Sequence, residues 1–241
     1  MEWLTEIITT MHWGAVAQII MIDILLGGDN AVVIALACRN LPPQQRRQGI
    51  FWGVFGAIAL RVVLITCAVY LLSLPMLKFL AGLLLIWIGV KLLVPHDEDE
   101  KHIEGSTRLL AAIKTIIVAD LVMSIDNVIG IAGAAQAAHA DHQTALIIFG
   151  LVVSVPFIVF GSQVILKLFD RFPIIITLGG ALLGWIGGGL LASDIFIADY
   201  LPQTPVVHYG AAAIGAVAVV ALAQLVMSRR KKGSIDVSKS E

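Results

Sequence analysis

The chain has 241 residues, of which 59% are hydrophobic and 14% charged, and its mean hydropathy is +0.93. Apolar runs this long have no water-soluble way to be covered, so the composition excludes a soluble domain and a disordered chain and predicts an integral membrane protein. A formal net charge of −1 provides no basic surface for nucleic acid, which leaves the lipid bilayer as the predicted surrounding.

Seven apolar runs along the chain are each close to the ~20 residues that a helix needs to cross a bilayer. Prolines separate several of these runs, as expected where a helix ends. We therefore predict an all-α, polytopic membrane protein with seven transmembrane helices at residues 13–37, 50–72, 76–94, 109–134, 144–169, 173–191 and 209–227.

The basic residues predict the orientation of these spans. If the N-terminus lies outside the cell, only Lys78 falls on the outer side and Arg61 lies mid-span. The N-terminus has no basic region typical of a cleaved signal peptide, so we expect the first run to remain in the mature protein. We predict an outer N-terminus and a cytoplasmic C-terminus, with the inner side holding Arg39, Arg46, Arg47, Lys91, Lys101, Arg108, Lys114, Lys167, Arg171, Arg229, Arg230, Lys231, Lys232 and Lys239.

Two acidic motifs lie inside apolar runs and repeat at one offset. The sequence Trp-Ile-Gly at 87–89 also recurs at 185–187, one residue more than the offset of 97 between the acidic motifs. Because three spans is an odd number, the second unit must enter the membrane from the opposite side, which predicts two inverted three-helix repeats plus one extra C-terminal helix. Such repeats are typical of secondary transporters. The offset of 97 residues pairs Asp23 with Asp120, Asp29 with Asp126 and Asn30 with Asn127.

The repeat also divides the chain into segments. Gly180, Gly184 and Gly188 form a ladder of small residues in the sixth run, which predicts close approach of another helix. The predicted segments are a first three-helix repeat at 1–94, a charged cytoplasmic linker at 95–108, a second repeat at 109–193, an outer loop with the seventh helix at 194–228 and a cytoplasmic tail at 229–241.

Four carboxylates inside the bilayer would together cost about 10–14 kcal/mol before pairing or protonation is counted. One explanation is structural, with protonated Asp and Asn joining helices by hydrogen bonds, but this has no need of a duplicated pattern. Carboxylate and amide oxygens suit Mg²⁺, Ca²⁺ or Mn²⁺. A buried carboxylate takes up a proton when no cation balances it, which provides a route to exchange of metal for protons.

The spacing within each motif limits how one ion could be held. On a straight helix Asp23 and Asn30 are ~10.5 Å apart along the axis, so they cannot hold one ion together. Either the helix breaks at Gly27 and Gly28, or the ligands come from both repeats. We expect Asp29 and Asp126 to approach each other together with Asn30 and Asn127, and Asp23 and Asp120 to lie one or two turns away.

Two further charged residues are candidates for roles near this site. Arg61 is a candidate counter-ion of the empty site or a structural partner of one Asp, and both interpretations stay open. Its counterpart in the repeat is Ile158. Asp194, at the outer end of the sixth run, is a candidate for lining an entrance.

The motif at 27–31, the Ser-Ile-Asp-Asn sequence at 124–127, the seven spans and the repeated Trp-Ile-Gly resemble the TerC family of bacterial integral membrane proteins. The resemblance runs from about residue 13 to residue 227. It implies a protein of the bacterial inner membrane that exports Mn²⁺ from the cytoplasm. The metal-binding residues it implies are Asp23, Asp29, Asn30, Asp120, Asp126 and Asn127.

Three other functions compete with export of a divalent cation. An accessory protein that delivers metal to exported enzymes would have the same site. Amino-acid export would need a cation for the substrate carboxylate, and Arg61 is the only candidate. An intramembrane aspartyl protease is suggested by residues 27–29, but its Tyr-Asp box is absent. We therefore expect no enzyme activity, no catalytic residue and no cofactor, and the oligomeric state stays open.

Overall fold

A computed structural model of the chain describes the backbone of residues 17, 20–21, 28–67, 74, 76–94, 105–137, 143–198, 200 and 202–237. It describes their side chains except at 65–66, 105, 126–137, 143–147 and 230–237. Within these residues the regular structure is entirely helical, which confirms the predicted class. The helices are α3 (Gly28–Cys38), α4 (Pro43–Thr66), α6 (Leu77–Leu93), α7 (Gly105–Ala137), α8 (Gln143–Arg171), α9 (Ile174–Ala192), α10 (Ile195–Ala198) and α11 (Pro205–Val237).

Four segments among the described residues are long and apolar enough to cross a membrane: Pro43–Leu64, Ile148–Arg171, Ile174–Ala192 and Pro205–Arg229. They belong to α4, α8, α9 and α11 and fall in four of the seven predicted spans. The helices α3, α6 and α7 lie in the other three predicted runs. The count of seven spans and the inverted repeat stay predictions.

Helix boundaries differ from the predicted ones where proline begins a helix. We predicted starts at residues 50 and 209, but α4 begins at Pro43 and α11 at Pro205. Proline is tolerated in the first turn because the N–H that it lacks would have no partner there. The four-residue helix α10 was not predicted.

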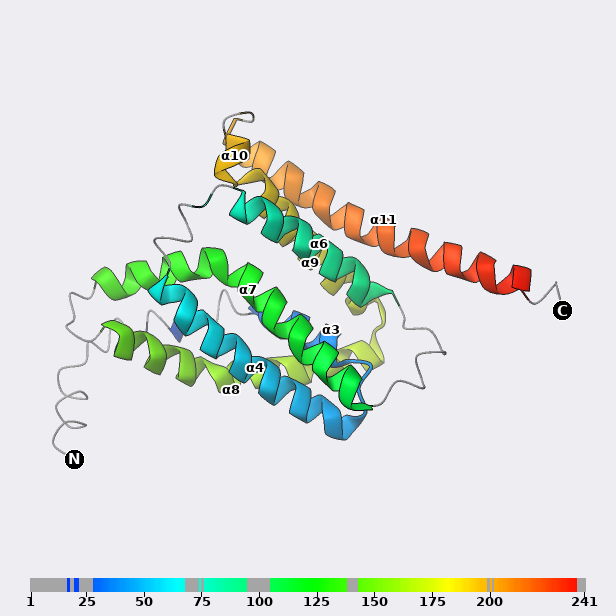
Figure 1. The fold of residues 1–241 in the computed structure, drawn as a ribbon, viewed down its shortest axis with the longest axis horizontal. Coiled ribbons are helices and arrows are strands. Elements are labelled where there is room, and N and C mark those ends of the chain that lie inside the picture. Colours follow the sequence, from blue (N-terminus) through cyan, green and yellow to red (C-terminus); the bar gives the residue numbers. More distant parts are fainter. Residues whose placement is uncertain are drawn as a thin grey trace.

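The helices fall into two groups (Figure 1). In the lower group of this view, α4 packs along α7 and α3 packs against α8 and α7. In the upper group, α9 packs between α6 and α11. Contacts of α6 with α7 and of α3 with α9 join the two groups.

The close contact of α9 with α11 depends on glycine. A Cβ atom added at Gly184 would meet the carbonyl oxygen of Gly215, and one added at Gly188 would meet that of Ala211. The two helix backbones therefore touch, and the predicted role of these α9 glycines in helix packing is confirmed.

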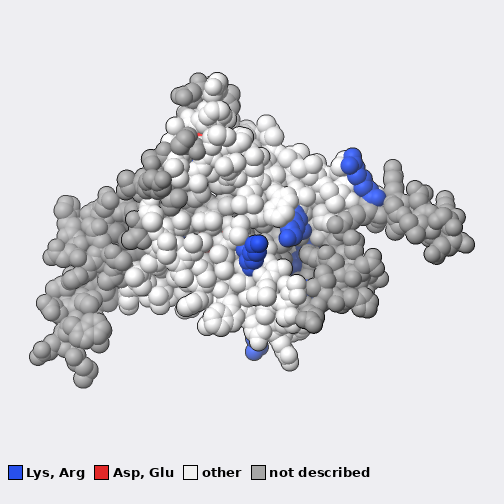
Figure 2. Space-filling view, viewed as in Figure 1, with Lys and Arg blue, Asp and Glu red and all other residues white. Residues whose placement is uncertain are grey.

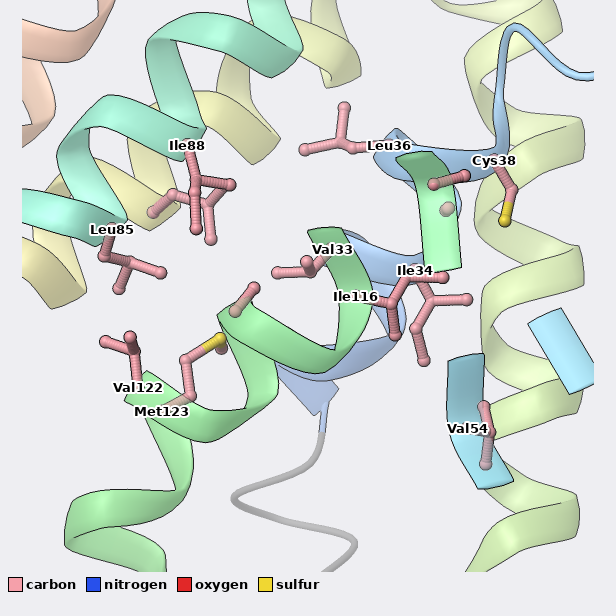
Figure 3. Packing of buried hydrophobic residues seen from close by; sticks show 14 of the residues in the cluster. Val33, Ile34, Leu36, Cys38, Val54, Leu85, Ile88, Ile116, Val122 and Met123 are labelled. Atoms are coloured by element: carbon pink, nitrogen blue, oxygen red, sulfur yellow. The ribbon is translucent and has the colours of Figure 1, made fainter. Parts of the chain in front are cut away.

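A single apolar cluster joins the two groups. Figure 3 shows Val33 and Ile34 of α3 beside α7, and Leu85 and Ile88 of α6 on the other side of the same cluster. Leu85 is fully buried. The acidic motif of α3 therefore begins a helix whose remaining turns lie in the middle of the bundle.

Much of the described outer surface is apolar. Large apolar side chains such as Phe55, Phe160 and Ile214 are 60–71% exposed, as expected for a surface that faces lipid. The first turns of α4 and α7 and the last turns of α6, α8 and α11 lie at the same end, on the right in Figure 1. Figure 2 shows the Lys and Arg side chains of this face from its centre toward that end. The predicted orientation, with this end on the inner side, stays a prediction.

Candidate functional site

The first acidic motif opens helix α3. Asp29 lies in the first turn, and its Oδ1 accepts a hydrogen bond of 2.9 Å from the backbone N–H of Asn30. A carboxylate is favoured at this position because the first N–H groups of a helix have no helical partner.

The Asn30 side chain is buried without hydrogen bonds. It is 4% exposed, and neither its Nδ2 nor its Oδ1 has a partner in the described part of the protein. An unsatisfied buried polar group costs about 1–3 kcal/mol, so such a group in a native structure needs an explanation. A bound cation would give the Oδ1 a partner.

The second acidic motif meets Arg61 of α4. The Nη2 of Arg61 donates to the Oδ1 of Asp120 at 2.6 Å, and its Nε donates to the Oγ of Ser124 at 3.0 Å. The Ser124 hydroxyl donates to the Oδ2 of Asp120 at 3.1 Å, which closes a ring of three hydrogen bonds. All three residues are buried, with exposures of 2%, 6% and 0% for Arg61, Asp120 and Ser124. We call these three residues the Arg61 triad.

Glycines of α4 bring the triad together. A Cβ atom at Gly53 would lie 2.6 Å from Ile116 of α7, and one at Gly56 would lie 2.5 Å from Ile117. These glycines therefore let α7 lie close to α4. Arg61 follows two turns after Gly53, where α4 passes Asp120 and Ser124. Asp120 and Ser124 share a face of α7 because they are four residues apart.

The two motifs lie within electrostatic range of each other. Asp29 interacts with the charges of both Arg61 and Asp120. The helices that bear the motifs, α3 and α7, pack directly against each other. The structure therefore brings together Asp29, Asn30 and Asp120, which were predicted from separate parts of the sequence.

The other predicted ligands lie outside the described side chains. Asp23 is outside the described residues, whereas Asp126 and Asn127 lie in the described backbone of α7 without described side chains. Among the described residues no three His, Cys, Asp or Glu side chains form a group that could hold a metal ion. The predicted helix break at residues 27–28 falls at the edge of the description, since α3 begins at Gly28, while α7 is continuous through the second motif.

Asp194 is fully buried and holds the start of α6. Its carboxylate accepts hydrogen bonds from the backbone N–H groups of Met76 at 3.2 Å, Phe79 at 3.0 Å and Phe196 at 2.8 Å. Met76 has a left-handed backbone with φ of 63°. Asp194 therefore fixes the corner between α9 and α10 against α6, and its predicted role at an entrance stays a prediction.

A cavity of about 420 Å³ opens at the basic end of the molecule. Polar side chains, among them Arg39, Asp170 and Gln224, line it together with apolar residues of α6, α9 and α11. None of the predicted metal ligands lines this cavity, so we do not include it in the candidate site.

Ser124 was not among the predicted site residues. Its only signal was the four-residue spacing from Asp120, which places both on one helix face. The pairing of Arg61 with Asp120 agrees with both interpretations of Arg61, a counter-ion of the empty site and a structural partner of one Asp. The choice of Asp120 as this partner depends on the register between α4 and α7.

Comparison with known proteins gives the family. Residues 8–232 match the integral membrane protein TerC family. The uncharacterized membrane protein YjbE of Bacillus subtilis is 45% identical over 185 residues, covering 77% of this chain and 82% of YjbE. The inner membrane protein YgdQ of Escherichia coli is 26% identical over 214 residues, covering 81% of this chain and 86% of YgdQ. No solved structure matches the chain. The chain belongs to the TerC family of integral membrane proteins.

Proposed function

We propose that this protein is a secondary transporter that exports divalent cations from the cytoplasm, with Mn²⁺ as its first candidate substrate and protons as candidate counter-ions. The observation that carries the proposal is the packing of α3 against α7, which brings Asp29 within electrostatic range of Asp120, next to an Asn30 amide without a partner among the described residues. Burying charge among apolar helices is costly, so ionisable residues inside a membrane indicate a functional site.

The oxygen atoms of the site favour hard divalent cations. Asp29, Asn30 and Asp120 supply carboxylate and amide oxygens, and we assign Asp23, Asp126 and Asn127 to the same site by the repeat. Mn²⁺, Mg²⁺ and Ca²⁺ prefer such ligands. Membership of the TerC family supports manganese among these three.

Two contacts between α6 and α9 support the inverted repeat. The Trp-Ile-Gly motifs differ by 98 residues, an offset that pairs Gly82 with Gly180 and Gly89 with Gly187. A Cβ atom at Gly187 would lie 2.8 Å from the carbonyl oxygen of Gly82, and one at Gly89 would lie 3.4 Å from that of Gly180. Exchange of the two halves converts one contact into the other, as a twofold axis in the membrane plane requires.

The helix pairs follow the same exchange. If α3, α4 and α6 correspond to α7, α8 and α9, the contact of α4 with α7 corresponds to that of α8 with α3. The contact of α6 with α7 likewise corresponds to that of α9 with α3. In transporters of this architecture, one group of helices rocks against another around a central site. The division into two groups supports this mode of alternating access.

Two alternative functions, export of an amino acid and delivery of metal to exported enzymes, can be compared with the site. Export of an amino acid would need a cation for the substrate carboxylate, but the guanidinium of Arg61 already binds Asp120. Delivery of metal to exported enzymes would use the same site as export does. A protein that transports without any partner is an exporter in its own right.

Complementation in bacteria tests the proposal. Cells that lack this protein should accumulate Mn²⁺ when challenged with it, and the intact gene should restore a normal content. Asp29→Asn or Asp126→Asn should abolish the rescue while the protein still inserts, because each removes a ligand charge. Asp170→Asn, which changes an exposed acid outside the site, is the matched control. Normal manganese in cells with Asp29→Asn would refute the site assignment.

A further inference from the structure

The three residues of the Arg61 triad are hydrogen-bonded to one another. Each oxygen of the Asp120 carboxylate accepts one hydrogen bond within it, from Arg61 and from Ser124. The Arg61 side chain is 3% exposed and that of Asp120 is 8% exposed, so solvent reaches neither group to a useful extent. A divalent cation that binds the Oδ1 of Asp120 on this side would therefore compete with the guanidinium of Arg61.

The arginine of the triad has no charged counterpart in the second repeat. The counterpart of Arg61 in the second repeat is Ile158 of α8, which is buried and apolar. A purely structural ion pair of the repeat would be expected in both halves. Because only one repeat carries this arginine, only the motif that contains Asp120 has the guanidinium as an ion-pair partner.

Replacement of one cation by another is physically reasonable at this position. A buried carboxylate without a partner is strongly unfavourable, so in an empty site Asp120 must either take up a proton or have a positive charge next to it. Asp29 lies within electrostatic range of Asp120, so a cation between them would interact with two negative charges at once. A dication attracts Asp120 more strongly than the guanidinium does, while Arg61 remains attached to α4 and can return.

We propose that Arg61 is a tethered cation that occupies Asp120 when the site holds no substrate and is displaced when a divalent cation binds. This inference rests on the proposed function and adds a mechanism for resetting the site. After release of the ion, Arg61 neutralises Asp120, so the empty transporter returns without an unpaired charge on that helix. Arg61 therefore weakens the binding of substrate and speeds its release.

Binding of Mn²⁺ to the purified protein tests the inference, with free Mn²⁺ followed by its electron paramagnetic resonance signal. Arg61→Met removes the competing cation and should tighten binding by about tenfold, in the range expected for a charged hydrogen bond. Its maximal rate of transport in liposomes should fall, because release slows. Arg61→Lys keeps a competing charge and should bind Mn²⁺ within about threefold of the wild type.

A double variant keeps the test valid if Arg61→Met alone fails to fold. Asp120→Asn leaves the guanidinium without its carboxylate, so the freed cation should repel Mn²⁺ and weaken binding. Arg61→Met combined with Asp120→Asn buries no unpaired charge in the triad and should fold. It should bind Mn²⁺ more tightly than Asp120→Asn alone, because the repelling charge is gone.

The outcomes separate this inference from the proposed function. If binding by Arg61→Met is unchanged or weaker, or if the double variant binds no better than Asp120→Asn, Arg61 does not compete with the substrate and the inference is wrong. If the wild-type protein transports Mn²⁺ in the same liposomes, the proposed function stands despite that result. A wild-type protein that neither binds nor transports Mn²⁺ would overturn both.

Discussion

At the scale of single residues, the two motifs of the site differ in whether their polar side chains have hydrogen-bond partners. Asp120 is held by the Arg61 triad, whereas the Asn30 amide has no partner among the described residues. The sequence could identify these residues, because Asp and Asn are costly in an apolar run. It could not predict that Ser124 joins them, since a serine hydroxyl in a helix commonly bonds to its own backbone.

The Ser124 hydroxyl supports a prediction at this scale. Ser124→Ala removes one hydrogen bond to Asp120 and one acceptor for Arg61, so it should lower the free energy of unfolding by about 1–3 kcal/mol. The rate of Mn²⁺ transport should fall by about tenfold, because Asp120 loses its fixed position. Thermal unfolding in detergent and flux in liposomes measure the two effects.

Ser162→Ala is the matched control for this prediction. Ser162 of α8 is also fully buried, but its hydroxyl donates at 2.8 Å only to the carbonyl oxygen of Val159 in its own helix. Its loss should change stability by less than about 1 kcal/mol and leave transport intact. Equal effects of the two substitutions would show that the triad has no special role.

At the scale of helices, the sequence predicts where elements lie better than how they meet. Apolar periodicity and length place a helix in each predicted run, because a backbone in lipid must satisfy its own hydrogen bonds. The pairing of Arg61 with Asp120 required the register between α4 and α7, which depends on how Gly53 and Gly56 receive the isoleucines of α7. This register depends on the surfaces of both helices, so it cannot be predicted from the sequence of either helix alone.

Two glycines of α11 provide a matched test of helix contact. A Cβ atom at Gly215 would meet the carbonyl oxygen of Gly184, whereas nothing lies within 4 Å of a Cβ atom at Gly210. Gly215→Ala should force α9 and α11 apart and cost about 1–3 kcal/mol of stability. Gly210→Ala should be neutral or should stabilise the protein by about 0.5 kcal/mol, because alanine favours the helix.

Thermal unfolding of both variants in the same detergent checks this prediction. A Gly215→Ala protein as stable as Gly210→Ala would mean that α9 and α11 do not touch through their backbones. Retention of transport by Gly210→Ala would show that α11 tolerates a methyl group where it faces no other helix.

At the scale of the whole molecule, charge and helix packing have separate roles. On the face in Figure 2, Lys and Arg side chains lie from the centre toward one end, while Asp29 and Asp120 lie within electrostatic range of each other in the apolar bundle. The group α6, α9 and α11 is joined by close glycine contacts, whereas Asp29 and Asp120 belong to the group α3, α4, α7 and α8. The sequence could predict the positive end and the duplicated motif. The division into two groups could not be predicted, because it depends on which helices pack most closely.

The central claim is that the acidic motifs carry a divalent cation across the bilayer. Purified protein in liposomes that contain no other protein, tested with Mn²⁺, Mg²⁺ and Ca²⁺ in turn, measures this most directly. We predict saturable Mn²⁺ flux by the wild type that falls to the background of empty liposomes with Asp29→Asn and with Asp126→Asn. Flux of the same size in the wild type and both variants, or no flux of any of the three ions, would contradict it.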